Sequence, residues 1–135
     1  MGNKADTIVN SGGSTLTVGK DLTINDEKGF SNGIQNIENS TIGAENITIT
    51  SKKVGFSNDG ILNKDNSVID VKGEIRITSE GSDGNASIEN KDGGKIHAGN
   101  ITIDQGGKNY AIHQTSENSS ITVKNNLTIT SRKYS

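Results

Sequence analysis

The stretch S-T-L-T-V, at residues 14–18, recurs four more times along this 135-residue chain. The later copies begin at Ser40, Ser67, Gly94 and Ser119, and they vary around a central Ile. The central residues are Leu16, Ile42, Ile69, Ile96 and Ile121, separated in turn by 26, 27, 27 and 25 residues. Such a period is typical of solenoids, in which each unit buries its apolar residues only by stacking on its neighbours.

Two further apolar segments accompany every copy. One precedes it, at residues 8–10, 34–36, 61–63, 88–90 and 112–114, and the other follows it, at residues 22–24, 47–49, 75–77, 101–103 and 127–129. Most of these segments alternate apolar and polar residues, which is the pattern of a strand with one buried face. Gly, Asn, Asp and Ser fill the gaps between them, and these residues favour turns.

We therefore predict an all-β fold, a right-handed single-stranded parallel β-helix of about five coils with roughly 26 residues each. Residues 1–135 would form a single β-helix domain. Each strand would pair with its equivalent one coil away, at about 4.8 Å. A narrow interior explains how 28% hydrophobic residues, 18 of them Ile, suffice for a core. A β-sandwich of antiparallel hairpins is the alternative, but it does not explain why one order of segments repeats.

Composition narrows the possible functions. The net charge is −2 and no basic cluster is present, so nucleic acid is not an expected partner. The chain has no Cys, which excludes cysteine-based metal centres and disulfides. We expect no cofactor and no metal.

No run of 18 apolar residues occurs, so this segment is not expected to insert into a membrane. The first six residues lack the apolar core of a signal peptide, so we expect either a cytosolic protein or a piece of a longer exported chain.

One polar column stands two residues after the Ile of each preceding segment. Its members are Asn10, Asn36, Asn63, Asn90 and Gln114. Stacked amides at the same turn of every coil can donate and accept along the axis while they satisfy backbone groups of the turn. We therefore predict a structural ladder, with a row of ligand-binding amides as the alternative.

Candidate catalytic residues are few. Asp70 and His97 occupy equivalent outward positions on adjacent coils, and we interpret them as a surface ion pair rather than a catalytic pair. We predict no catalytic residues.

Thr pairs such as Thr48 and Thr50 favour an ice-binding array, but Arg76 and Asp104 interrupt it.

Phe30 and Phe56 occupy equivalent G-F-S-N turns. We expect them to stack and close a corner. If they are instead exposed, they would form an adhesive apolar patch.

Several motifs carry a family resemblance. They are N-I-T-I-T at 46–50, G-N-I-T-I at 99–103, N-L-T-I-T at 126–130, and the G-I-x-N strand starts at 33–36 and 60–63. In these motifs the chain resembles the β-helical passenger regions of autotransporters and related large bacterial surface adhesins. The resemblance implies a non-enzymatic stalk or adhesive segment that is secreted to the bacterial cell surface. It also implies a protein or glycan ligand on a host or neighbouring cell.

Other expectations concern the rest of the protein. No signal sequence, C-terminal membrane barrel or cap is recognisable, so the resemblance implies a fragment of a longer passenger. Open edges at both ends of a solenoid favour end-to-end self-association. Two other functions remain open, a fragment of a pectate-lyase-like carbohydrate-active enzyme and an ice-binding solenoid.

Overall fold

A computed structural model describes residues 6–27, 31–51, 58–82, 84–107 and 110–132 of the chain. In these ranges the chain forms thirteen β-strands. Among the described residues, no helix is long and apolar enough to cross a bilayer. Phe30 and Phe56 lie outside the described residues, so their predicted stacking remains a prediction.

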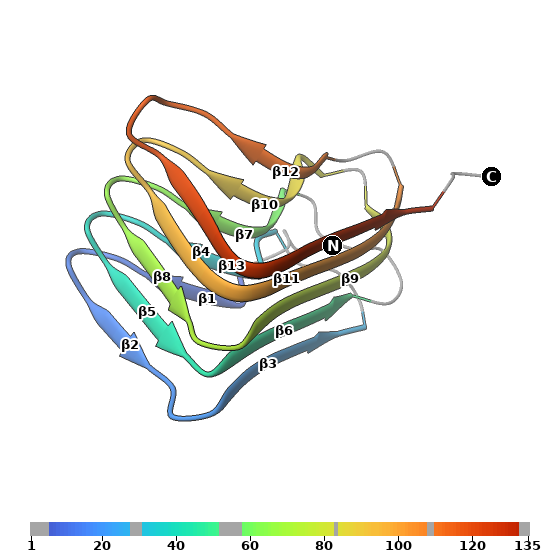
Figure 1. Cartoon of the computed structure of the whole chain (residues 1–135), viewed down its shortest axis with the longest axis horizontal. Helices are drawn as coiled ribbons and strands as arrows, with labels where there is room; N and C mark the ends of the chain where they lie inside the picture. The colour runs from blue at the N-terminus through green and yellow to red at the C-terminus, as the bar shows by residue number, and fades with distance from the viewer. Residues whose placement is uncertain (1–5, 28–30, 52–57, 83, 108–109, 133–135) are drawn as a thin grey trace, which may run out of the picture.

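The strands lie on three faces, which we call first, second and third in the order that the chain visits them (Figure 1). The first face holds β1 (Ile8–Asn10), β4 (Ile34–Asn36), β7 (Asp59–Asn63), β10 (Ala86–Asn90) and β12 (Tyr110–Gln114). The second face holds β2 (Thr15–Thr17), β5 (Thr41–Ala44) and β8 (Val68–Val71). The third face holds β3 (Asp21–Asp26), β6 (Asn46–Ser51) and β9 (Glu74–Ser82). The longer strands β11 (Lys95–Gly107) and β13 (Ser120–Ser131) continue from the second face into the third.

All the strand pairs are parallel, and each joins equivalent positions of neighbouring coils. On the first face the paired column is Ile8, Ile34, Ile61, Ile88 and Ile112. On the second face it is Leu16, Ile42, Ile69, Ile96 and Ile121. The predicted parallel β-solenoid is therefore confirmed, and Figure 1 shows its coils stacked from the blue N-terminal coil to the red C-terminal one.

The core is a set of isoleucine columns that runs along the solenoid axis. Ile42, Ile69 and Ile96 have no exposed surface, and neither do Ile49 and Ile77 on the third face. Burying one such side chain contributes about 1.5–3 kcal/mol. Because every coil covers its neighbours, a few isoleucines per coil suffice to fill the interior.

Two kinds of corner separate the faces. Between the first and second faces, two successive residues adopt positive φ, for example Glu38 and Asn39, both at 61°. Between the second and third faces the chain bends sharply, and we call this corner the bend. Neighbouring coils approach closely there, since a Cβ on Gly99 would lie 2.7 Å from the carbonyl oxygen of Gly73. Glycine is therefore required at this point of the bend.

Candidate functional site

The predicted amide column forms a continuous row of hydrogen bonds along one corner. Each Nδ2 donates to the side-chain oxygen one coil further on, with distances of 2.9, 2.8, 2.9 and 2.8 Å along Asn10, Asn36, Asn63, Asn90 and Gln114. Asn63 Nδ2 also donates to the carbonyl oxygens of Ser67 and Lys95, at 3.0 and 3.3 Å. Asn36, Asn63 and Asn90 have no exposed surface. These amides therefore bind the chain's own corner and are not presented to a ligand.

A second polar column supports the same corner. The hydroxyl oxygen of Ser40 accepts a hydrogen bond from the backbone N–H of Ser14, and that of Ser67 accepts from Ser40, both at 3.1 Å. Ser40 and Ser67 are fully buried. The first residue of the repeated pentapeptide thus has a structural role that we did not predict.

A hollow lies along the bend. It has a volume of about 490 Å³ and is lined by Asp70, Val71, Lys72, His97, Ala98, Gly99, Thr122 and Lys124. A second hollow of about 240 Å³ continues it toward the N-terminal coils, lined by Thr17, Val18, Gly19, Gly43, Ala44, Glu45, Asp70 and Lys72. Since both hollows share Asp70 and Lys72, they form one shallow groove parallel to the solenoid axis, which we call the bend groove.

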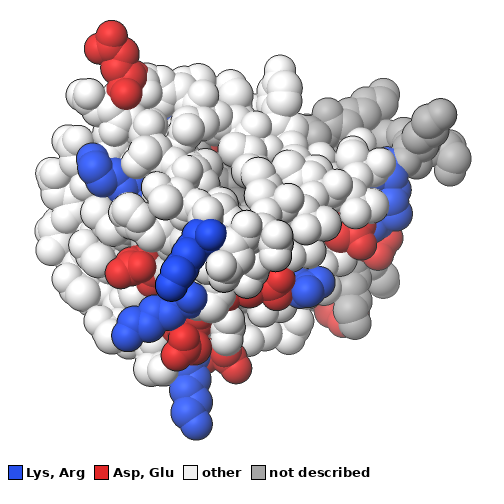
Figure 2. All heavy atoms as spheres, viewed as in Figure 1, with Lys and Arg blue, Asp and Glu red and all other residues white. Residues whose placement is uncertain are grey.

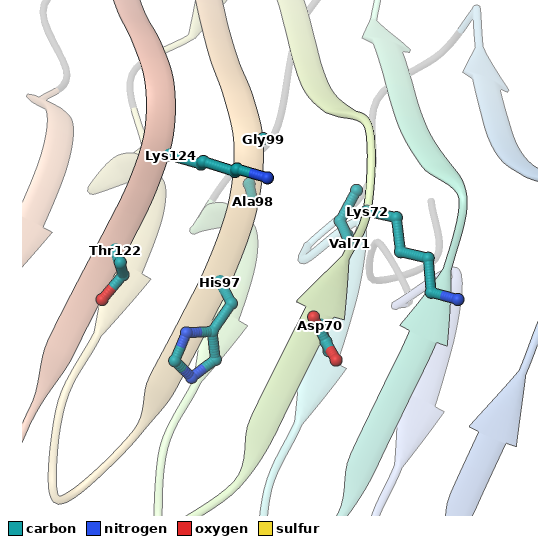
Figure 3. A pocket seen from close by; sticks show the side chains of 8 residues that line it. All are labelled: Asp70, Val71, Lys72, His97, Ala98, Gly99, Thr122 and Lys124. Atoms are coloured by element: carbon teal, nitrogen blue, oxygen red, sulfur yellow. The ribbon is translucent and has the colours of Figure 1, made fainter.

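The residues of the bend groove follow from strand alternation and the glycines of the bend. Val71 and Ala98 point inward and are 2% and 5% exposed, so they form the floor. Asp70, His97 and Thr122 pair in register on adjacent strands and point outward (Figure 3). Figure 2 shows Lys and Arg side chains intermingled with Asp and Glu on the lower part of this side of the molecule. The groove therefore offers both hydrogen-bond donors and acceptors to a polar ligand.

The predicted ion pair between Asp70 and His97 is wrong. The two residues are neighbours in register, as predicted, and both are exposed. No hydrogen bond or ion pair joins them in the part of the chain that the structure describes, and Figure 3 shows the two side chains apart on their strands. Parallel neighbours have Cα atoms close together, but exposed side chains remain free to point into solvent.

The third face is not a uniform hydroxyl array. Its outward column reads Thr23, Thr48, Arg76, Thr102 and Thr128. Glu74 accepts hydrogen bonds from Arg76 Nε at 3.2 Å and from Thr102 Oγ1 at 2.6 Å. Arg132 pairs with Asp104 on the same side of the solenoid. Charged networks therefore interrupt the threonine pairs that ice binding would require.

One buried carboxyl pair escaped the sequence analysis. Asp59 and Glu89, on β7 and β10, are 3% and 9% exposed. Burial, followed by the influence of the Glu89 carboxyl, raises the pKa of Asp59 to about 7. The available signal was the repeated Asp or Asn two residues before the first-face Ile, at Asp6, Asn32 and Asp59.

The described residues contain no group of three or more His, Cys, Asp or Glu side chains placed to hold a metal ion. The fold and the groove define a parallel β-solenoid with a shallow groove along one corner, which has an apolar floor and polar side chains around it. No protein-family model, no curated protein and no solved structure matched the chain.

Proposed function

We propose that this chain is a non-enzymatic structural and adhesive segment of a secreted bacterial surface protein, of the kind found in autotransporter passengers. The observation that carries the proposal is the bend groove on an otherwise regular solenoid. Asp70, His97 and Lys72 present polar groups over the buried floor of Val71 and Ala98. A concave surface with a few polar groups around an apolar floor suits a short glycan or an extended peptide.

Two properties of the solenoid support a role as a stalk. Every coil pairs with its neighbours through backbone hydrogen bonds, and the buried amide ladder ties the coils along one corner. Such arrays are quasi-one-dimensional, so they extend by adding coils and present long surfaces. A ligand-binding groove parallel to the axis would then be displayed along a rigid rod.

The enzyme alternative receives less support from the carboxyl groups. Asp59 and Glu89 are the buried carboxyls of the part of the chain that the structure describes. Asp59 Oδ1 also accepts hydrogen bonds from the backbone N–H of Ala86 and from Asn85 Nδ2, both at 3.1 Å. Glycoside hydrolysis requires two carboxyls that face a sugar across a gap of about 5 Å or more. Asp59 is 3% exposed and its Oδ1 already accepts these two hydrogen bonds, so it is not placed to face a sugar.

The proposal is tested by binding, with the purified chain applied to an array of bacterial and host glycans and to immobilised cell-surface proteins. We expect reproducible binding that Lys72→Glu and His97→Ala each weaken by about tenfold, equivalent to about 1.4 kcal/mol. Lys64→Glu, in a turn away from the bend groove, serves as the matched control. Release of unsaturated or reducing sugars from pectin or other polysaccharides would contradict the non-enzymatic assignment. Equal binding by all variants would exclude the bend groove.

A further inference from the structure

The two ends of the solenoid expose strands that pair on one side only. At the N-terminal end these strands are β1, β2 and β3, and at the C-terminal end they are β12 and β13 (Figure 1). Within the part of the chain that the structure describes, no strand adds to their outer edges. An edge of this kind presents backbone N–H and C=O groups with which a further strand can pair.

Both ends also expose apolar side chains at positions that the inner coils bury. Leu127 and Ile129 are 49% and 44% exposed, whereas their register partners one coil earlier, Ile101 and Ile103, have no exposed surface. In the first coil a hollow of about 470 Å³ has an apolar lining, which consists of Ile8, Val9, Leu16, Val18 and Leu22. Each end therefore carries the apolar surface that a neighbouring coil covers elsewhere in the solenoid.

The amide ladder leaves complementary groups at its two ends. Every amide nitrogen in it donates toward the C-terminal end, so the series begins with Asn10 and ends with Gln114. Among the described residues, no donor bonds to Oδ1 of Asn10, and Nε2 of Gln114 donates to no acceptor. The N-terminal end thus offers an acceptor and the C-terminal end offers a donor, both at the same corner of the solenoid.

A second repeated contact, at the bend, is open in the same way. There, a backbone N–H of one coil donates to Oδ1 of an asparagine one coil earlier, from Glu74 to Asn46 at 2.8 Å and from Asn126 to Asn100 at 3.1 Å. Asn126 holds this position in the last coil and Asp21 holds it in the first. No described residue donates to Oδ1 of Asn126, so the backbone N–H of an incoming Asp21 would find an acceptor there.

We propose that this chain associates head to tail, with the first coil of one copy docking on the last coil of another copy. In this junction β1 adds to β12, and β2 and β3 add to β13, in the parallel register that already joins neighbouring coils within one chain. Gln114 of one copy donates to Asn10 of the next copy and continues the ladder. The apolar lining of the incoming first coil covers Leu127 and Ile129.

The open hydrogen-bonding groups select this orientation. Docking of two C-terminal ends would bring two Gln114 donors together without an acceptor, and it would leave Asn10 uncovered in both copies. Because a head-to-tail contact joins two different surfaces, it does not close, and repeated docking builds an open filament. The first face stacks five strands, so at about 4.8 Å per strand each copy would lengthen the filament by about 24 Å.

The test is analytical ultracentrifugation of the whole chain over a concentration series. We expect the average mass to rise from 14.2 kDa and to pass twice this value without a limit. Leu127→Lys and Leu16→Lys each place a charge in one half of the apolar junction, so each variant alone should remain monomeric. An equimolar mixture of the two variants should stop at a dimer, because only one intact pair of ends remains.

Matched variants separate the junction from general effects of charge. Thr128→Lys and Thr17→Lys add the same charge at exposed neighbouring positions and should associate as the wild type does. Gln114→Glu keeps the oxygen that accepts from Asn90 and removes the outward donor, so it should weaken association about tenfold and leave the Tm unchanged. Lys72→Glu, in the bend groove, should not affect association, so this inference and the proposed function can fail separately.

Three results would overturn the proposal. The first is a wild-type chain that stays monomeric at about 1 mM, and the second is one that stops at a closed dimer. The third is association that both Leu127→Lys and Leu16→Lys retain. Circular dichroism shows whether each variant keeps its strands, and Gln114→Glu provides the measurement if a lysine variant does not fold.

Discussion

Asn36 donates a hydrogen bond from Nδ2 to Oδ1 of Asn63 at 2.8 Å, although 27 residues separate the two in sequence. Neither residue has any exposed surface. The same Nδ2 lies within hydrogen-bond distance of the carbonyl oxygens of Ser40, at 3.2 Å, and Val68, at 3.1 Å. One side chain thus ties the backbones of two coils together. Buried amides therefore hold the corner between the first and second faces.

The central member of the amide ladder should be important for stability. Asn63→Ala leaves Asn36 without its acceptor and Asn90 without its donor, so we expect a loss of about 1–3 kcal/mol in the free energy of unfolding. Urea denaturation measures this loss. Asn25→Ala is the matched control because Asn25 lies exposed on β3, and it should change stability by less than about 0.5 kcal/mol. Similar losses in both variants would show that the ladder contributes nothing specific.

The isoleucine columns should dominate the free energy of unfolding. Ile69 is fully buried, and Ile69→Ala should cost about 2–5 kcal/mol because it removes apolar contact and leaves a cavity. Thr102 faces outward and donates one hydrogen bond to Glu74, so Thr102→Ala should cost no more than about 1 kcal/mol. Both values come from guanidinium chloride titrations. Comparable costs would contradict the inward and outward assignment of these strands.

The bend should tolerate a methyl group at one glycine and not at another. A Cβ on Gly99 would lie 2.7 Å and 2.8 Å from the backbone oxygens of Gly73 and Lys72, so Gly99→Ala should cost about 1–3 kcal/mol as the coils separate. Gly19 has nothing within 4 Å of its Cβ position. Gly19→Ala should therefore leave the Tm unchanged or raise it slightly. Calorimetry of the two variants decides the matter, and a neutral Gly99→Ala would mean that the coils are not in close contact at the bend.

Glu38 offers a stabilising substitution. It adopts φ of 61°, in a turn whose equivalent in the first coil is Gly12-Gly13, at 68° and 75°. A side chain with a Cβ pays about 1–2 kcal/mol in this left-handed region, so Glu38→Gly should raise the free energy of unfolding by about 1 kcal/mol. Glu38→Gln removes the charge and keeps the backbone strain. If the glutamine variant is stabilised as much as the glycine variant, charge and not backbone conformation limits this turn.

The repeat by itself was enough to predict the fold and the register. The spacing of Leu16, Ile42, Ile69, Ile96 and Ile121 predicted which residues pair between coils, and the structure confirms these pairs. Alternation of apolar and polar residues also identified the buried isoleucines. Both signals can be read from the sequence, because the alternation has the two-residue period of a strand and the repeat has the length of one coil.

Only the tertiary structure revealed the bend groove, the absence of a bond between Asp70 and His97, and the burial of Asp59 and Glu89. Register places Cα atoms side by side, but it does not determine where an exposed side chain points. Asp59 and Glu89 lie 30 positions apart and do not share a register position, since Asp59 pairs with Ala86. Their burial, and the influence of Glu89 on the pKa of Asp59, depend on the shape of the corner, which arises only when the coils are stacked.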